Sequence, residues 1–264
     1  MRWESTELKK KGKKGQKPYT GKVNSKQQDA WEREYRTQRM LSPSNQPHAD
    51  VMRFVRYLKK KYRKRGERLE LEGLRVLDLG SGTGRNSYYF AKEGGQVVGF
   101  EFSPTALAMG EQFAQEGGLA IDYRLQNIGE AYPLPDASID IALDVTSSNS
   151  LTDVERAVYL RELARVLVPD GWLFLRALSF EGDTHAKELV RRFPGPESDT
   201  CVHPDLGVVE KVFSRESLAA LYEPHFEIRE LERTQHYATV SGRTYKRSYW
   251  VVYLQRRNTA EKLK

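Results

Sequence analysis

Short apolar runs alternate with amphipathic stretches of helical length from residue 74 onward. The apolar runs predict strands at 74–79, 96–102, 121–125, 139–144 and 172–178. Strands that alternate with helices are typical of βαβ units and a parallel sheet. The pattern therefore predicts an α/β chain in which helices connect the strands of a mainly parallel sheet.

Capping residues set the expected limits of the helices between these strands. Ser103 precedes Pro104, which pairs an N-cap with proline at the first helical position. Thr152, with Glu155 three residues later, predicts a capping box. The helix that starts there is expected to end in the Pro-Asp-Gly turn at 169–171, before the fifth strand.

The segment after the fifth strand is less regular. A short helix is expected at 185–193, a proline- and glycine-rich loop through 194–207, and another helix at 214–222. The last two apolar runs, 226–237 and 245–254, surround Ser241-Gly242 and predict an antiparallel hairpin.

Two helices are expected ahead of the α/β region. Residues 9–28 are rich in Lys, Gly and Gln and cannot bury enough surface to offset the entropy of ordering, so disorder is expected there. Order begins near Gln28, and Trp31 and Tyr35 share one helical face. A second helix at 48–65 carries an apolar stripe made of Val51, Phe54, Val55, Leu58 and Tyr62.

The expected organisation follows from these segments. It comprises a disordered basic tail over 1–27, a helical extension over 28–68, an α/β domain over 69–257 and a C-terminal tail over 258–264. The α/β domain contains an insertion around 179–213. Because this insertion follows the carboxyl end of the fifth strand, we expect it to contribute to a binding pocket.

The net charge of +7 is concentrated in two segments. Residues 1–28 contain nine basic and two acidic residues, and residues 53–68 contain nine basic residues against Glu67 alone. The basic residues from Lys9 to Lys26 and from Arg53 to Arg65 can be solvated faces, or they can bind the phosphates of RNA. The rest of the chain is acidic on balance, so the basic character does not extend to its body.

Composition excludes several classes of protein. The chain is 39% hydrophobic, yet its apolar runs are only a few residues long, against about 20 for a membrane-spanning helix. The first residues lack the apolar region of a secretory signal. Cys201 is the only cysteine and cannot form an internal disulfide. We therefore expect a cytoplasmic protein that does not enter a membrane.

A glycine-rich segment joins the first strand to a helix at 76–86, with the sequence Val-Leu-Asp-Leu-Gly-Ser-Gly-Thr-Gly-Arg-Asn. Glycines let the backbone approach a ligand closely, and the following helix N-terminus favours a carboxylate or phosphate. Asp78 lies at the end of this strand, and Glu101 ends the next one. A carboxylate at the latter position can bind the two hydroxyls of a ribose.

A dinucleotide is one ligand that such a turn can bind. Its fingerprint is G-x-G-x-x-G/A, whereas the glycines here are Gly80, Gly82 and Gly84, and Arg85 occupies the sixth position. A bulky charged side chain there fits poorly with tight packing of helix on strand. A nicotinamide-dependent oxidoreductase is therefore a lesser alternative.

Five segments, in chain order, resemble motifs of the class I S-adenosylmethionine-dependent methyltransferases. They are 76–84, 97–107 with Glu101 in place of the more frequent Asp, 126–128, 133–140 and 163–173. The resemblance extends over residues 28–256 and implies a Rossmann-like, seven-stranded, mostly parallel sheet with an antiparallel terminal strand. It also implies helices on both faces and an N-terminal helical extension.

The resemblance assigns a set of residues to S-adenosylmethionine. Glu101 binds the ribose, Asn127 reads the edge of the adenine in place of a frequent Asp, and Asp144 either faces substrate or sulfonium or caps a helix. The full cofactor set consists of Asp78, Gly80, Ser81, Gly82, Gly84, Glu101, Phe102, Asn127, Ile128 and Asp144.

Candidates for contact with the methyl acceptor lie outside these motifs. Trp31 and Tyr35 either close over the cofactor or belong to the core. His185, His203 and Asp205 lie in the insertion, and any one of them is a candidate general base. A Cys-x-His pair is too sparse for a zinc site, so no metal is expected.

These observations favour methyl transfer to a small molecule, and the C-terminal segment loosely resembles methyltransferases of the tellurite-resistance and thiopurine types. The segment 145–149 lacks an Asn-Pro-Pro-Tyr tetrad, which argues against the adenine-N6 and glutamine methyltransferases that carry it. An RNA methyltransferase that uses the two basic segments is the alternative. A protein that binds the cofactor without turnover is a further one.

Overall fold

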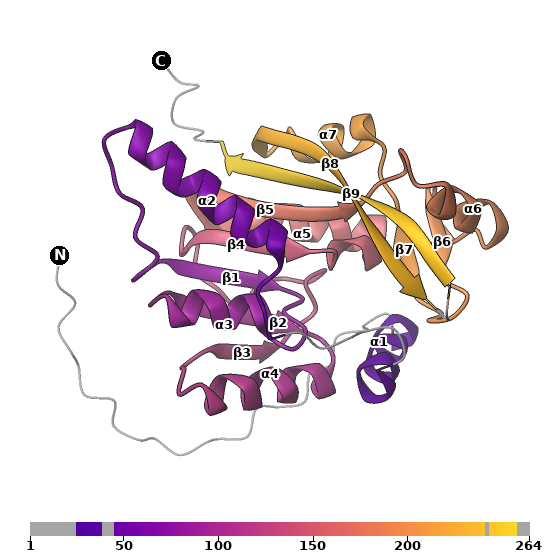
Figure 1. The fold of residues 1–264 in the computed structure, drawn as a ribbon, viewed down its shortest axis with the longest axis horizontal. Coiled ribbons are helices and arrows are strands. Elements are labelled where there is room, and N and C mark those ends of the chain that lie inside the picture. Colours follow the sequence, from indigo (N-terminus) through magenta and orange to yellow (C-terminus); the bar gives the residue numbers. More distant parts are fainter. Residues whose placement is uncertain (1–24, 39–44, 241–242, 258–264) are drawn as a thin grey trace.

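The computed structural model describes residues 25–38, 45–240 and 243–257, so the basic residues from Lys9 to Lys22 and the C-terminal tail over 258–264 lie outside it. Seven strands form one sheet in the order β3-β2-β1-β4-β5-β9-β8 (Figure 1). Its strands are β1 (Arg75–Leu79), β2 (Gln96–Glu101), β3 (Asp122–Leu125), β4 (Ile139–Val145), β5 (Leu167–Leu178), β8 (Phe226–Val240) and β9 (Arg243–Arg256).

The first five strands are parallel, and β9 runs antiparallel to both β5 and β8. This confirms the predicted α/β, Rossmann-like sheet and its antiparallel terminal strand. Strand order reverses at β1, which lies between β2 and β4. In such sheets the crevice at this reversal, outside the carboxyl ends of the strands, is where ligands bind.

Helices cover both faces of the sheet (Figure 1). On one face α2 (Ala49–Lys64) and α3 (Arg85–Lys92) contribute Phe54 and Phe90 to a buried cluster with Trp172 and Phe174 of β5. On the other face α5 (Asp153–Val166) and α7 (Arg215–Tyr222) pack against a second cluster. Two further helices, α1 (Ser25–Thr37) and α4 (Pro104–Glu116), lie close together near the outer strands β2 and β3. The expected helix at 48–65 is thus α2, and its apolar stripe belongs to the core of the sheet.

The predicted caps are present. The Ser103 Oγ accepts from the Ala106 amide at 3.1 Å, and Thr152 and Glu155 form both bonds of the capping box. The prediction that α5 ends in a turn at 169–171, before the fifth strand, is wrong, because α5 ends at Val166 and β5 begins at Leu167. The register of β4 against β5 jumps from Ile139–Leu167 to Ile141–Trp172, which shows that residues 168–171 form a bulge inside β5. Asp170 takes a φ of +64° in this bulge.

The insertion after β5 contains more structure than the sequence predicts. Its helix α6 (Thr184–Arg192) was expected, but the loop after it forms a two-stranded sheet of β6 (Thr200–Val202) and β7 (Val209–Lys211). The 3₁₀ turn η1 (Ser148–Ser150) was also not expected. Three-residue elements are too short to show a period in the sequence, and their pairing depends on neighbours that are distant in the chain.

The packing of α2 gives the first prediction. The Phe54 side chain is fully buried, and its ring centroid lies 5.0 Å from that of Tyr253 and 5.5 Å from that of Phe174. We expect Phe54→Ala to lower the free energy of unfolding by about 3–5 kcal/mol, because it removes contacts and leaves a cavity. Urea denaturation measures this loss. Arg56→Ala, on the exposed face of the same helix, is the control and should change stability by no more than about 0.5 kcal/mol. Equal losses would contradict a core role for α2.

Candidate functional site

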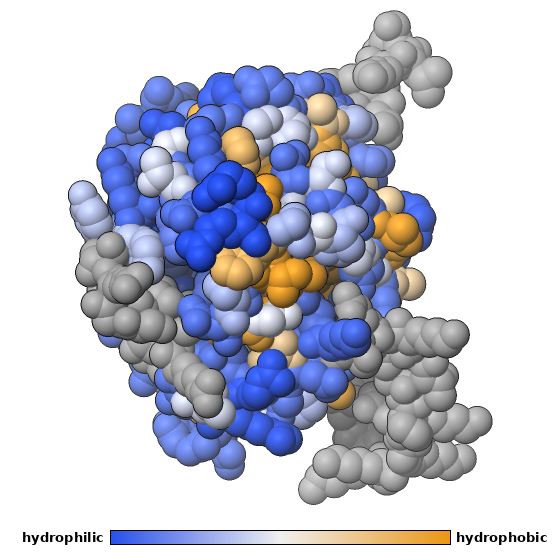
Figure 2. Space-filling view, turned by 90° about the vertical axis from the view of Figure 1, so that its right-hand side faces the viewer, coloured by the Kyte–Doolittle hydropathy of each residue, from blue (hydrophilic) through white to orange (hydrophobic). Residues whose placement is uncertain are grey.

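A cavity of about 290 Å³ opens at the carboxyl ends of the parallel strands, where strand order reverses. Figure 2 shows this side of the molecule, where apolar residues gather in the middle of a largely hydrophilic surface. Nine of the residues predicted from the sequence line the cavity, namely Trp31, Tyr35, Gly80, Ser81, Gly82, Glu101, Phe102, Asn127 and Ile128. The fold thus brings together residues that are up to 97 positions apart in the chain.

The Glu101 carboxylate is the central polar group of this cavity. It is buried, with 3% of the residue exposed, and accepts from the backbone amides of Gly82 at 2.9 Å, Phe102 at 2.9 Å and Ser103 at 2.8 Å. Burial raises its pKa to about 7, although these three hydrogen bonds act in the opposite direction. Glu101 therefore joins the end of β2 to the glycine turn after β1.

Two glycines of the turn make close approaches that a side chain would block. Gly80 has a φ of +65°, and a Cβ there would lie 2.4 Å from the Ser147 Oγ of the loop after β4. Gly82 has a φ of +56°, and a Cβ would lie 2.8 Å from the Tyr35 hydroxyl. Both values of φ favour glycine. The turn is therefore shaped by the loop after β4 on one side and by α1 on the other.

Two predicted cofactor residues, Asp78 and Gly84, lie behind the cavity wall and are not among its lining residues. The Asp78 carboxylate accepts from the Ser87 amide at 3.1 Å and its Oγ at 2.7 Å, so it faces the first turn of α3 rather than the crevice. Burial raises its pKa to about 6. Gly84 begins α3 with a φ of +83°, and a Cβ there would meet the Tyr123 hydroxyl. Sequence spacing gave the position of both residues but not the direction of the Asp78 side chain.

Asp144 was expected to face the crevice, but the structure places it inside the fold. Its carboxylate accepts from the Ser147 amide at 2.9 Å and the Tyr159 hydroxyl at 2.7 Å. It therefore caps the turn after β4, the second of the two roles considered for it. The cavity wall at this strand end is formed instead by Val145, Thr146 and Ser147.

Helix α1 closes one side of the cavity. Gln27, Trp31, Tyr35 and Gln38 recur at helical spacing and all line it. The helix is held mainly by polar contacts: the Glu32 carboxylate accepts from the Ser103 and Thr105 hydroxyls at the start of α4, and Gln27 exchanges hydrogen bonds with Val209 of β7. Trp31 and Tyr35 thus contact the cavity, and neither is among the buried core side chains.

The adenine-edge candidates, Asn127 and Ile128, line the cavity just after the end of β3. The Asn127 Oδ1 accepts from the Gly129 amide at 2.9 Å, which fixes the side chain and leaves a second lone pair on the oxygen. Ile128 is buried beside it, and the Phe102 backbone carbonyl accepts from Gln28 Nε2 of α1 at 2.6 Å.

The three general-base candidates do not reach the cavity. None of them is among its lining residues. His185 stacks on Tyr245 with ring centroids 4.0 Å apart, and the buried His203 accepts from the Asp205 amide at 3.3 Å. The two histidines thus pack within the insertion and against the hairpin, whereas the Asp205 side chain is exposed. In the described ranges no group of three or more His, Cys, Asp or Glu side chains is arranged to hold a metal ion.

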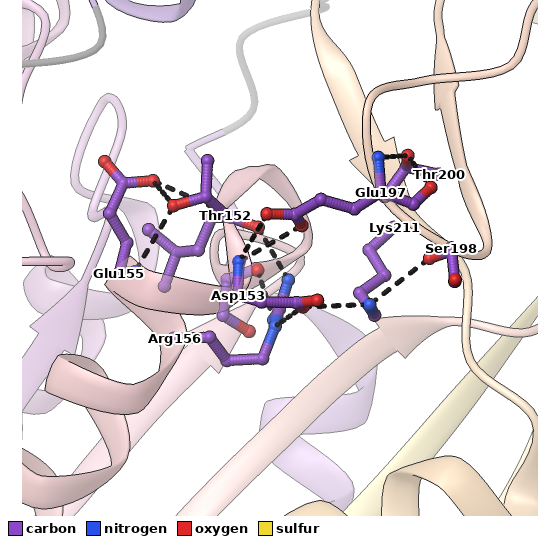
Figure 3. A network of polar contacts seen from close by, with 10 residues as sticks. Thr152, Asp153, Glu155, Arg156, Glu197, Ser198, Thr200 and Lys211 are labelled. Atoms are coloured by element: carbon purple, nitrogen blue, oxygen red, sulfur yellow. Dashed lines mark hydrogen bonds and ion pairs between the residues drawn. The ribbon is translucent and has the colours of Figure 1, made fainter.

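A polar network connects the insertion to the cavity (Figure 3). The Glu197 carboxylate accepts from the Asp153 amide at 2.9 Å, and Lys211 Nζ lies 2.9 Å from the Asp153 carboxylate. The buried Arg156 donates to the carbonyls of Ser148 at 2.7 Å and Leu151 at 2.8 Å. This network fixes the segment that leads from β4 into α5, and part of that segment lines the cavity.

Several lining residues were not predicted from the sequence. Arg85, Asn86, Gln27 and Thr146 all line the cavity. Arg85 and Asn86 were identifiable as the first helical residues after a ligand-binding turn, whereas Thr146 has no such signal. Its φ of +66° is rare for a β-branched residue, and only the tertiary structure can impose it.

Comparison with known proteins agrees with this geometry. Residues 77–175 match the family described as "Methyltransferase domain". A ubiquinone biosynthesis O-methyltransferase of Bradyrhizobium sp. is 34% identical over 120 residues, which are 46% of this chain and 46% of the relative. The chain thus aligns with about half the length of such curated relatives.

Solved structures share the fold over a larger part of the chain. A SAM-dependent methyltransferase of Methanosarcina mazei has a TM-score of 0.61 at 24% identity and covers 70% of this chain and 93% of its own. The Burkholderia thailandensis 1,6-didemethyltoxoflavin-N1-methyltransferase, solved with S-adenosylhomocysteine, has a TM-score of 0.59 at 17% identity and covers 92% and 94%.

Two independent features therefore coincide: a Rossmann-like sheet in this strand order, and a matched methyltransferase domain whose glycine turn and acidic strand end form the cavity. Residues 77–175 thus match a methyltransferase domain, and the chain has the fold of solved S-adenosylmethionine-dependent methyltransferases.

Proposed function

We propose that this protein transfers a methyl group from S-adenosylmethionine to a nucleophilic atom of a small molecule. The observation that carries the proposal is the buried Glu101 carboxylate, which is bonded to the Gly82 amide in the cavity at the strand-order reversal. A carboxylate at the end of the second strand is placed to accept from the hydroxyls of a ribose.

The residues present fit this cofactor. Gly80 and Gly82 leave room where a Cβ would collide, so the backbone can approach the methionine portion. Arg85 and Asn86 line the cavity at the start of α3 and provide donors for a carboxylate, while Asn127 and Ile128 lie where the adenine edge would be read. When bound, the cofactor supplies a methyl group already activated by a sulfonium.

The task of the chain is then to align the acceptor and to exclude water. Trp31 and Tyr35 close the cavity from α1. Of the carboxylates that line it, Glu101 is bonded to backbone amides and Glu155 completes the capping box with Thr152. No histidine of the described chain lines the cavity. We infer that no side chain of this cavity removes a proton from the acceptor. The acceptor then binds in a protonation state that is already nucleophilic.

A small molecule is the acceptor that the enclosure favours. The cavity is closed by α1, and similar proteins are named for O-methylation in ubiquinone biosynthesis and N-methylation of a toxoflavin precursor. None of the helices in the described part of the chain is long and apolar enough to span a membrane. The cytoplasmic location stays a prediction.

The RNA alternative depends on the exposed basic residues of α2. Arg56, Lys59, Lys60, Arg63 and Lys64 form no ion pair within the described residues. The other basic segment lies almost wholly outside them, and the reported relatives lend RNA no support. A solvated face is the simpler explanation of this helix.

Binding of S-adenosylhomocysteine tests the cofactor. Isothermal titration should show binding to the wild-type protein, and Glu101→Ala should weaken it by about 10–100-fold, because a hydrogen bond to a charged group contributes about 1.5–3 kcal/mol. The exposed Glu216→Ala on α7 serves as the control and should leave affinity unchanged. Binding of NAD in place of S-adenosylhomocysteine would overturn the assignment.

The raised pKa of Glu101 predicts a pH dependence. Only the ionised carboxylate offers all its oxygen lone pairs to the amides and to a ribose, so affinity should rise as the pH increases from 5.5 and level off above its pKa of about 7. Titrations of S-adenosylhomocysteine across this range should show the rise in the wild type. In Glu101→Gln the affinity should change less with pH. Some pH dependence should remain in that variant, because Asp78, whose pKa is about 6, still titrates. An identical slope in both proteins would exclude Glu101 as its source.

The close approach at Gly80 gives a further prediction. Gly80→Ala places a Cβ against Ser147 at a φ of +65°, while Gly118→Ala meets a similar φ of +67° with no atom within 4 Å. Both variants should lose about 1–2 kcal/mol of stability from the left-handed backbone. Only Gly80→Ala should also lose affinity for S-adenosylhomocysteine, by about tenfold or more, since it alone disturbs the turn. Equal affinities in calorimetry would show that the turn does not contact the cofactor.

A further inference from the structure

A second polar cluster lies beside the cavity and is not used by the cofactor residues. Four elements meet there: the start of α2, the start of α3, the end of β5 and the inner part of the β8–β9 hairpin. Their interacting side chains are His48, Asp50, Arg85, Arg176, His236 and Tyr249.

Arg176 is held rigidly at the centre of this cluster. Only 8% of the residue is exposed, its Nε lies 3.2 Å from the Asp50 carboxylate, and its guanidinium stacks 3.4 Å from the centre of the Tyr249 ring. Its two terminal amino groups donate to no acceptor within the described residues. A guanidinium fixed in this way presents a planar fork that matches a carboxylate, sulfonate or phosphate group.

The cluster contains more positive than negative charge. Asp50, which faces Arg176, also pairs with Arg53 at 3.0 Å. Arg85 is half-buried and forms no ion pair with any carboxylate of the described chain. The charge of Asp78 acts on Arg85 electrostatically, but the Asp78 carboxylate is hydrogen-bonded to Ser87 instead. The single charge of Asp50 is shared between Arg53 and the buried Arg176, so an anion beside Arg176 would stabilise the protein.

The neighbouring histidine responds to the same positive charge. Burial, followed by the charges of Arg176 and Arg85, lowers the pKa of His48 to about 4. His48 is therefore neutral at physiological pH, and its Nδ1 accepts from the Asp50 amide at 3.1 Å. It adds no positive charge to the cluster, because burial and, after it, the charges of the two arginines disfavour its protonated form.

The cluster adjoins the cavity on the side of the loop after β4. Val145 and Thr146 line the cavity, and both contact the backbone of Arg176: Val145 pairs with it across the two strands, and the Thr146 amide donates to its carbonyl at 2.8 Å. The Arg176 side chain itself is not among the lining residues, so the cluster is a neighbour of the cavity. Arg85 belongs to both sites, since it lines the cavity and interacts electrostatically with Arg176.

We propose that Arg176, oriented by Asp50 and Tyr249, anchors an oxyanionic group on the methyl acceptor. The acceptor is then a small acid, held by its carboxylate, sulfonate or phosphate while its nucleophilic atom reaches the methyl end of the cavity. This inference rests on the proposed methyl transfer and narrows its substrate class. Arg176 is a specificity-determining residue in this scheme.

Sulfate is a suitable probe because it presents the same oxygen geometry without further chemistry. Isothermal titration of sodium sulfate into the full-length protein, saturated with S-adenosylhomocysteine and held at constant ionic strength with chloride, should show saturable binding. Arg176→Gln should weaken it by about tenfold or more, and Arg176→Lys, which keeps the charge but loses the fork, by an intermediate factor. Arg56→Gln, an exposed and unpaired arginine of α2, should stay within about twofold of the wild type.

The variants also need a check of folding, because Arg176→Gln leaves Asp50 with one fewer cation. Thermal unfolding and S-adenosylhomocysteine affinity of each variant supply it. If Arg176→Gln does not fold, Arg176→Lys carries the test, since its ammonium still pairs with Asp50. Weaker sulfate binding with unchanged S-adenosylhomocysteine affinity is the expected result.

Three results would overturn the proposal. One is wild-type protein that binds no sulfate saturably, and another is Arg176 variants that bind it as tightly as the wild type. The third is sulfate binding that occurs without S-adenosylhomocysteine and is lost on saturation with it, which would assign the site to the cofactor carboxylate. Failure of the methyltransferase assignment is separate, because it would appear as absent S-adenosylhomocysteine binding in the wild type.

Discussion

The cavity depends on one buried charge. Glu101 brings a carboxylate to the end of β2 and is bonded to the amides of Gly82, Phe102 and Ser103. Ser103 in turn caps α4 and contacts Glu32 of α1. The same carboxylate thus fixes the glycine turn, begins the next helix and positions the helix that closes the cavity. Its burial raises the pKa, which means that the fold maintains a costly group at the place where a polar ligand would repay that cost.

Patterns that are local in the chain were sufficient for the sheet and for the cofactor end of the cavity. The limits of β1 to β4, the Ser103 cap and the capping box at Thr152 each depend on residues a few positions apart, so the sequence alone specifies them, whereas the start of β5 was predicted at 172 and lies at Leu167. The Glu101 position followed from its distance to the glycine turn. The directions in which side chains point were harder to predict. Asp78 and Asp144 stand at strand ends as expected, yet each finds nearer donors, Ser87 and Tyr159, that the sequence does not reveal.

The acceptor side could not be predicted because it is assembled from distant segments. Arg176 belongs to β5, Tyr249 to β9 and Asp50 to the first turn of α2, and no local spacing relates them. The histidines of the insertion were candidate bases only because histidine often serves as one. Their neighbours show that they pack against other side chains instead, as His185 does against Tyr245. The backbone conformation of Thr146 could not be predicted either, since a β-branched residue adopts the left-handed conformation only where the surrounding structure imposes it.

The two halves of the site differ in how their charges are balanced, and this difference bears on specificity. On the cofactor side each carboxylate is held in place by donors of the protein, so affinity comes from preorganised geometry. On the acceptor side one carboxylate, Asp50, faces the two arginines Arg53 and Arg176. An acidic acceptor would complete the charge balance there, whereas a neutral analogue would leave the fork of Arg176 desolvated and unpaired. Discrimination against the neutral analogue therefore arises from the penalty of leaving the terminal amino groups of the buried Arg176 without an acceptor.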